Sequence, residues 1–425
     1  MKRLYLFVIF GMFVIAACNT TSQTTSPMHV KVIDGQGKGI ANATVVIGNQ
    51  TGAMESFLST DALGAAHFAS APSNATVTAA FSCYDPSTNR TYYSVDIAYG
   101  VNVSAVTLTL GTCDGTAQGS VDVHVTDQVA GITSHEVTLG PITYGGSSVT
   151  MDFNGSVQDD GNISVFAGGY DDAGNLKGYG FALDRPAVNG SVIDIVIDRT
   201  DLVRHTHRFG NVPSNAIEYF AYASLLRKRA ATNLPLNFTW GAAPLPETFA
   251  TYSSGSFADN NLFGAAVGLD SDSDGNADAT VGMARCRRNA SDQIFDFSLT
   301  PLLPGNLTFT PGTAGRPVIS WSNNDSRSTV QTLTLSRRSN TPQRVSFSYS
   351  MTAPASATGL VFPELPDELA AFRPGTYDNL SLNTTKFDSP TSYEDYLKAL
   401  PGFNGYCYGE AGLSSYSYAR ISRLP

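Results

Sequence analysis

The chain has 425 residues and a formal net charge of −10, and only 15% of its residues are charged. Its longest basic run, Arg227-Lys228-Arg229, is short, so this acidic chain is excluded as a nucleic-acid-binding protein. The length allows three or four domains of about 100 to 150 residues each. Abundant Gly, Ser, Thr, Asn and Tyr favour all-β domains with many turns over helical ones.

The first residues have the pattern of an export signal. Lys2 and Arg3 precede an apolar run over residues 4–17. This run is shorter than the roughly 20 residues that a transmembrane helix needs. A charged start followed by a short apolar stretch is typical of secretory signal peptides. We therefore interpret residues 1–17 as a signal peptide that is removed on export.

The end of the apolar run, Ile15-Ala16-Ala17-Cys18, resembles the lipobox of bacterial lipoproteins. The resemblance implies cleavage before Cys18 and attachment of diacylglycerol to its thiol, so a membrane would hold the chain through this lipid. By the same analogy, Asn19 favours the outer membrane if the host has two membranes. Residues 18–27 are expected to form a flexible tether. The alternatives are an ordinary signal peptide with a chance cysteine and an uncleaved anchor.

Residues 28–113 have the pattern of a first β domain. Strands are predicted over residues 29–33, 39–47, 60–68 and 75–79, separated by turn residues. This series resembles the carboxypeptidase-regulatory-like family. The resemblance implies a seven-stranded Ig-like sandwich related in shape to transthyretin, a fold that occurs beside many unrelated activities.

Residues 119–201 predict a second small sandwich, which could be a diverged copy of the first. Val121, Val123 and Val125 alternate with polar residues, as in a half-buried strand. The strands over residues 163–167 and 178–182 enclose an Asp-rich turn, which is a hairpin signal.

Two further β units are expected over residues 202–300 and 301–425. The stretch 216–228 fits a helix or a strand, and we interpret it as a strand because strands surround it. Residues 317–322 and 331–335 resemble early strands of a fibronectin type III domain, which implies that Trp321 is its core tryptophan.

One short C-terminal helix is the exception in an otherwise all-β prediction. Thr391 and Glu394 have the spacing of a capping box, and Pro401-Gly402 would end the helix. The predicted fold is therefore a tandem series of Ig-like or fibronectin-like β-sandwiches behind a lipoprotein signal peptide.

The chain contains five cysteines. With Cys18 assigned to lipid, an even number remains for an oxidising compartment, and three pairings are open. The simplest joins neighbours in sequence. A thiol nucleophile or a cysteine metal site would need a closer spacing. The two expected disulfides are Cys83–Cys113 and Cys286–Cys407.

An Asp-rich stretch at residues 270–278 matches most of a calcium-binding loop. Acids stand at loop positions 1, 3, 5 and 9, with Gly at position 6. The loop resembles those of thrombospondin type 3, dockerin and FG-GAP repeats, although Val281 replaces the usual Glu at position 12. We expect structural calcium here, and the alternative is a solvated acidic turn. The expected ligands are Asp270, Asp272, Asp274, Asn276 and Asp278.

The histidines carry a weaker metal signal. His205 and His207 could point to one strand face, as in some zinc or copper sites. The alternative is an exposed strand or linker. His29 and His67 are expected to be ordinary strand-face residues.

The sequence holds no catalytic constellation: a Gly-x-Ser-x-Gly elbow, a zinc-protease helix and a phosphate loop are all missing. Four tyrosines could form a sugar-stacking platform or, alternatively, cross-strand packing pairs. They are Tyr406, Tyr408, Tyr416 and Tyr418.

The predicted function is that of a non-enzymatic, lipid-anchored envelope protein that binds an envelope protein or a polysaccharide. One alternative is an accessory or catalytic subunit of a secreted carbohydrate- or peptide-processing system. Another is a purely architectural spacer.

Overall fold

The computed structural model describes the chain from residue 25 to residue 423, with gaps. It leaves out residues 36, 87, 112, 114–118, 141, 154–156, 158–160, 228–229, 254–256, 259, 288–289, 313–314, 323–324, 341–343 and 400–414, and the side chains of residues 227–236. Within the described residues, the predicted all-β class with one short α-helix is confirmed.

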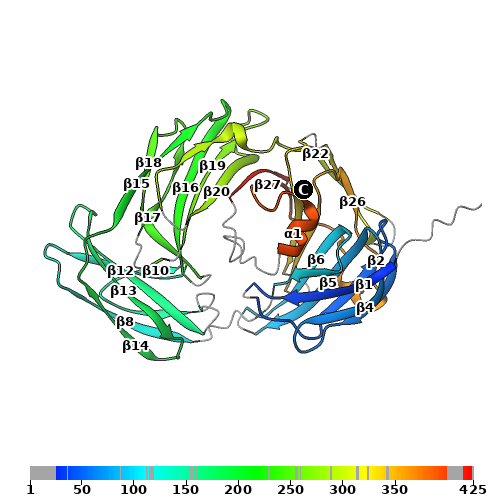
Figure 1. The fold of residues 1–425 in the computed structure, drawn as a ribbon, viewed down its shortest axis with the longest axis horizontal. Helices are drawn as coiled ribbons and strands as arrows, with labels where there is room; N and C mark the ends of the chain where they lie inside the picture. The colour runs from blue at the N-terminus through cyan, green and yellow to red at the C-terminus, as the bar shows by residue number, and fades with distance from the viewer. Residues whose placement is uncertain are drawn as a thin grey trace, which may run out of the picture.

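The described strands fall into four units of seven. Around the arch in Figure 1 the units stand in the order 2, 3, 4, 1, with units 1 and 2 at its two ends. In unit 1, β1 pairs with β4 and β7, and β3-β2-β5-β6 form the second layer. Seven strands in two layers are what the resemblance of residues 28–113 implied. The strands are β1 (Thr25–Ile33), β2 (Thr44–Gly48), β3 (Met54–Ser59), β4 (Ala65–Pro72), β5 (Ala75–Asp85), β6 (Arg90–Val101) and β7 (Ala105–Thr109).

Unit 2 repeats this topology: β8 pairs antiparallel with β11 and parallel with β14, as β1 does with β4 and β7. The predicted hairpin of residues 163–167 and 178–182 is confirmed as β12 and β13. The strands are β8 (Ser120–Asp127), β9 (Ser134–Leu139), β10 (Ile142–Gly145), β11 (Ser148–Asp152), β12 (Asn162–Tyr170), β13 (Leu176–Pro186) and β14 (Ser191–Ile197).

Unit 3 repeats the topology again, with β15 between β18 and β21 and with β17-β16-β19-β20 as the second layer. The ambiguous stretch 216–228 is a strand, as predicted, and forms β16. The strands are β15 (Val203–Gly210), β16 (Ala216–Arg227), β17 (Ala230–Ala242), β18 (Thr248–Ser253), β19 (Asn260–Leu269), β20 (Ala279–Arg287) and β21 (Ile294–Asp296), followed by the 3₁₀ turn η1 (Phe297–Leu299).

Unit 4 has the same four-stranded layer, β25-β24-β27-β28, but its small sheet is β22-β23-β26 with β22 antiparallel to β23. Trp321 on β23 is buried, as predicted. The elements are β22 (Gly305–Thr310), β23 (Val318–Ser322), β24 (Val330–Ser339), β25 (Val345–Pro354), β26 (Gly359–Val361), the 3₁₀ segment η3 (Asp367–Phe372), β27 (Asn379–Phe387), α1 (Tyr393–Ala399) and β28 (Tyr416–Arg423).

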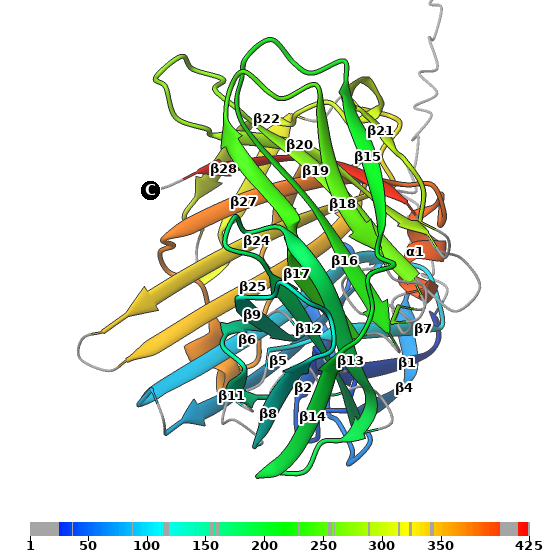
Figure 2. The same cartoon turned by 90° about the vertical axis from the view of Figure 1, so that its left-hand side faces the viewer.

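The large layers of units 1, 3 and 4 join edge to edge into one 12-stranded sheet. β20 pairs antiparallel with β28, and β25 pairs parallel with β6. Figure 2 shows the strands from β27 through β24, β25 and β6 to β5 following one another across the molecule. The sheet therefore crosses the sequence ranges 28–113, 202–300 and 301–425, which were predicted to be separate domains.

The 12-stranded sheet has an outer face packed against the small sheets of units 3 and 4. Leu333 and Met351 face the β22-β23-β26 side, and Ala221 and Val267 pack with Phe295 of β21. The opposite, inner face packs against the β4-β1-β7 sheet and against α1, through a core that includes Val77, Val330 and Leu397.

The start of α1 differs by one residue from the predicted capping box. The hydroxyl of Ser392, rather than that of Thr391, accepts the backbone N–H of Asp395 at 3.1 Å. The same hydroxyl donates to the Asp395 carboxylate at 2.8 Å, so Asp395 rather than Glu394 bonds the capping side chain. Tyr393 then reaches the core, where its hydroxyl donates to the backbone carbonyl of Tyr99.

The predicted Cys83–Cys113 disulfide is present and links residues 30 positions apart in unit 1. Cys286 is buried and also disulfide-bonded. Its expected partner, Cys407, lies outside the described residues, so that pairing stays a prediction.

Removing the unit 1 disulfide should destabilise the chain. We expect the double variant Cys83→Ser, Cys113→Ser to lose about 3–4 kcal/mol of unfolding free energy, because the open loop gains conformational entropy when unfolded. Urea unfolding followed by tyrosine fluorescence measures the difference. An unchanged midpoint and slope would contradict a stabilising role for this bond.

Candidate functional site

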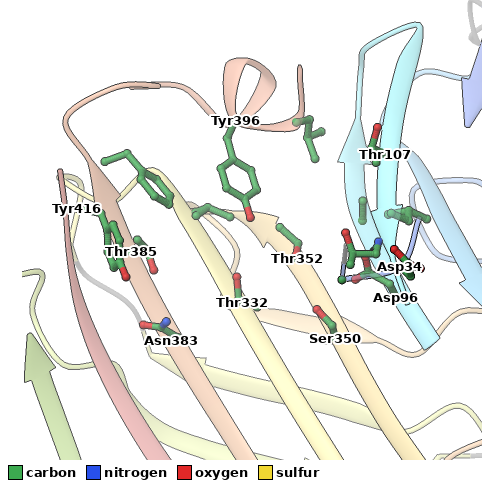
Figure 3. Close-up of a pocket in the computed structure, with 17 residues that line it drawn as sticks. Asp34, Asp96, Thr107, Thr332, Ser350, Thr352, Asn383, Thr385, Tyr396 and Tyr416 are labelled. Carbon is green, nitrogen blue, oxygen red and sulfur yellow. Dashed lines mark hydrogen bonds between the residues drawn. The ribbon is translucent and has the colours of Figure 1, made fainter. Parts of the chain in front are cut away.

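The inner face of the 12-stranded sheet carries two adjoining cavities. The first, of about 510 Å³, lies between β24, β25, β27 and β28 on one side and β6, β7 and α1 on the other. Its floor is polar, and Figure 3 shows Tyr416 at one end and Asp34 and Asp96 at the other. The hydroxyl and amide side chains of the floor are Thr332, Ser350, Thr352, Asn383 and Thr385.

Among the described residues that line the first cavity, Asp96 has a strongly shifted pKa. It accepts a backbone hydrogen bond from Thr109 at 2.8 Å and a further bond from the hydroxyl of Ser350. Burial outweighs these bonds and raises the pKa of Asp96 to about 6.

The second cavity, of about 430 Å³, is lined mainly by rings from β16, β17 and β28. Phe220 lies 5.2 Å from the ring of Tyr222 and 5.2 Å from that of Phe238, between ring centroids. Tyr416 and Tyr418, two of the four tyrosines considered as a sugar-stacking platform or as packing pairs, complete the aromatic lining. Tyr406 and Tyr408 lie outside the described residues.

Glycines on the neighbouring strands allow these rings to lie against the sheet. Gly264 is the cross-strand partner of Tyr222, and Gly282 that of Tyr418. A Cβ atom on Gly264 would lie 2.3 Å from Cε1 of Tyr222, and one on Gly282 would lie 2.6 Å from Cζ of Tyr418. Any larger residue at either glycine would have to displace the ring opposite it.

Asn383 and Tyr416 line both cavities and so join them. The Oδ1 atom of Asn383 is buried and has no hydrogen-bond partner among the described residues. A buried acceptor of this kind needs a donor, because leaving it unpaired costs about 1–3 kcal/mol. The junction of the two cavities therefore offers an acceptor to a ligand or to solvent.

The Asp-rich stretch forms the turn between β19 and β20, away from these cavities in the fold. The carboxylates of Asp270, Asp272 and Asp274 each offer an oxygen within 4.8 Å of the others. The other two predicted ligands make local bonds: Asn276 donates to Asp274, and Asp278 accepts from Ser271.

The same carboxylates already have donors within the turn. Asp270 accepts the backbone N–H groups of Ser273 and Gly275, at 2.6 and 2.9 Å. The backbone N–H of Asn276 holds the pKa of Asp274 below its usual value. Each carboxylate oxygen keeps lone pairs free for an ion, so the residues fit both a calcium loop and a self-bonded acidic turn. Calcium binding stays a prediction.

His205 and His207 are buried core residues rather than metal ligands or an exposed linker. Nε2 of His207 bonds the hydroxyl of Thr251 at 2.6 Å, and its Nδ1 accepts the backbone N–H of Gln293 at 3.1 Å. His207 thus has no nitrogen left for a metal. Burial lowers the pKa of His207 to about 4, so the ring is neutral at pH 7.

The predicted lipidation site, Cys18, lies outside the described residues. In the part of the chain that the structure covers, no helix is both long and apolar enough to cross a membrane.

No known protein family matches the sequence, and no curated protein matches it either. Three solved structures show partial likeness. The Bacillus anthracis TIE protein is 9% identical, with 64% of this chain and 49% of that chain covered and a TM-score of 0.16. A streptococcal ancillary pilin is 8% identical, with 56% and 89% covered and a TM-score of 0.14.

The third is the pilus adhesin SpaC from Lactobacillus rhamnosus GG in an open conformation. It is 8% identical, with 79% of this chain and 44% of that chain covered and a TM-score of 0.15. The chain therefore spans about half the length of the TIE protein. At these TM-scores the likenesses carry no argument about function, and membership of the carboxypeptidase-regulatory-like family stays a prediction.

Asp96 should give the unfolding free energy a pH dependence. Its pKa of about 6 in the folded chain lies above the value of about 3.9 for unfolded Asp. The folded state therefore binds the extra proton, and the unfolding free energy falls as the pH rises from about 4 to about 6.

We expect Asp96→Asn to remove this fall and to add about 1–3 kcal/mol to the unfolding free energy near pH 7. Urea unfolding across this pH range tests it, with the exposed Asp172→Asn as the control. Equal slopes in the wild type and Asp96→Asn would contradict it.

Calcium, if it binds the Asp-rich turn, should stabilise the folded chain. At ten times its dissociation constant the ion would add about 1.4 kcal/mol, which calorimetry detects as a higher Tm. We expect Asp272→Asn to abolish the increase and Asp172→Asn, in the exposed turn between β12 and β13, to retain it. Absence of binding heat with an unchanged Tm at millimolar calcium would contradict the prediction.

Proposed function

We propose that this chain is an exported, lipid-anchored bacterial surface protein that binds a glycan on the inner face of its 12-stranded sheet and has no enzymatic activity. The anchoring half of the proposal rests on the sequence: the charged start, the apolar run and the lipobox at Cys18. The binding half rests on the two joined cavities.

The main support for a glycan as the ligand is the Oδ1 atom of Asn383, which has no hydrogen-bond partner among the described residues. It can accept a hydrogen bond at a junction where hydroxyl groups lie on one side and aromatic rings on the other. A sugar ring has hydroxyl groups at its edge and C–H groups on its faces. Its hydroxyl groups can bond the polar side of the junction, and its faces can pack on the aromatic rings. Concave cavities of this size suit single sugar residues of a polymer better than the flat surface of a folded protein.

A second candidate function is hydrolysis of the bound polymer, and one observation favours it. Asp34 and Asp96 line the same cavity, and Asp96 has the raised pKa that a general acid requires. Turnover of a bound oligosaccharide that Asp96→Asn abolishes would move the proposal to this alternative.

Glycan binding should depend on the exposed rings of the second cavity. We expect Phe238→Ala to weaken binding about 5- to 30-fold, because the ring is 51% exposed and available to a ligand. The measurement is a glycan array, followed by isothermal titration of the strongest hit.

Phe57→Ala is the matched control for Phe238→Ala. Phe57 is 43% exposed on β3, the opposite edge strand of the same sheet, and it lines neither cavity. Its replacement should leave binding unchanged. An empty array, or equal affinities for the wild type and Phe238→Ala, would contradict the proposed function.

A further inference from the structure

A basic pocket of about 820 Å³ lies on the face of the β4-β1-β7 sheet that points away from the unit 1 core. It is separate from the two cavities on the inner face of the 12-stranded sheet. On β1, exposed His29 and Lys31 alternate with buried Val30 and Val32, so the exposed pair points away from the unit 1 core. The cationic or protonatable side chains that line the pocket are His29, Lys31, Lys38, His67 and Lys398.

The charge of this pocket is opposite to that of the chain. Acidic residues outnumber basic ones by 36 to 26 overall, yet no Asp or Glu is among the described residues that line it. At least three carboxylates lie nearby: those of Asp34, Asp61 and Asp395. Asp34 accepts the backbone N–H of Lys38 at 2.9 Å. Asp61 is already bonded by the backbone N–H groups of Leu63 and Ala65, and Asp395 makes an exposed ion pair with Lys398 at 3.5 Å. Exposed pairs of this kind are weak, so the pocket keeps its cationic character.

The strand pairing of β1 with β4 brings the two histidines together. His29 and His67 are direct cross-strand partners, and their Nδ1 atoms are in hydrogen-bond contact. Local sequence could place each on a strand face but could not show that the two faces coincide. Lys31 is the cross-strand partner of Ala65, so it lies between the histidine pair and the β3–β4 turn. Both imidazole rings can donate to an anion when protonated.

An apolar element accompanies these cations. Leu63, in the β3–β4 turn, lines the pocket and is 76% exposed. Lysines around an exposed leucine suit the surface of an anionic bilayer, where phosphate groups meet the ends of acyl chains. A soluble phosphate would use only the cations.

The position of β1 gives the pocket access to such a surface. Only residues 19–24 separate the predicted lipid-bearing Cys18 from Thr25, the first residue of β1. Fully extended, this segment spans at most about 25 Å. The anchor would therefore hold unit 1 close to the headgroups, at a high local concentration.

We propose that the basic pocket of unit 1 docks on the phosphate groups of the anionic lipid surface in which the chain is anchored. This inference rests on the anchoring half of the proposed function and is independent of glycan binding. Docking would fix the orientation of unit 1 relative to the membrane.

The test uses the mature chain from position 18 with Cys18→Ser, so that no acyl chain contributes. We expect it to sediment with vesicles of phosphatidylcholine mixed with phosphatidylglycerol and not with phosphatidylcholine alone. Each of Lys31→Gln, Lys38→Gln and Lys398→Gln should weaken binding about fivefold, and the triple variant about a hundredfold. Lys177→Gln, an exposed lysine of unit 2, should have no effect.

Two results would overturn the proposal. One is equal binding of the wild type and the triple variant to the anionic vesicles. The other is a shift of the His29 and His67 ring resonances with inorganic phosphate but no vesicle binding, which would assign the pocket to a soluble phosphate. Glycan binding by the triple variant separates this proposal from the inner-face site, and mass spectrometry of Cys18 from the host tests the anchor itself.

Discussion

Backbone hydrogen bonding between the edges of neighbouring units is the interaction on which the rest of the molecule depends. Unpaired edge strands normally invite aggregation, and proteins cover or pair them. Here β20 is paired by β28, and β25 by β6, so three sandwich layers become one sheet. The inner face is continuous only because of this pairing, and the cavity that reaches from β6 to β28 crosses two units.

The continuous sheet also decides which side chains can form a site. Successive residues of each strand point to opposite faces of the sheet. One set of side chains therefore packs in the core on the outer face, and the residues between them point to the inner face. Glycines opposite Tyr222 and Tyr418 remove the side chains that would push those rings away from the sheet. Hydroxyl and amide groups on β24, β25 and β27 supply the polar half. The combination suits a ligand with both apolar faces and hydroxyl edges.

Local features of this fold could be predicted from the sequence, whereas the features that depend on distant pairing could not. Alternation identified β16, and the buried Trp321 followed from the pattern around it. Nothing local indicates that β25 will pair with β6, because the two are separated by more than half the chain. For the same reason the sequence left Asn383 and Asp96 unnoticed. It offered a metal site or an exposed strand or linker for His205 and His207, whereas tertiary packing buries both.

Native-state hydrogen exchange of β6, β20, β25 and β28 tests the joined sheet most directly. If edge pairing holds the units together, the amides that bond across β20–β28 and β25–β6 will exchange as slowly as those inside one unit, such as between β5 and β6. Exchange of these amides at the rate of the outer edge strands β3 and β17 would contradict a continuous sheet, and with it the inner face on which the proposed function rests.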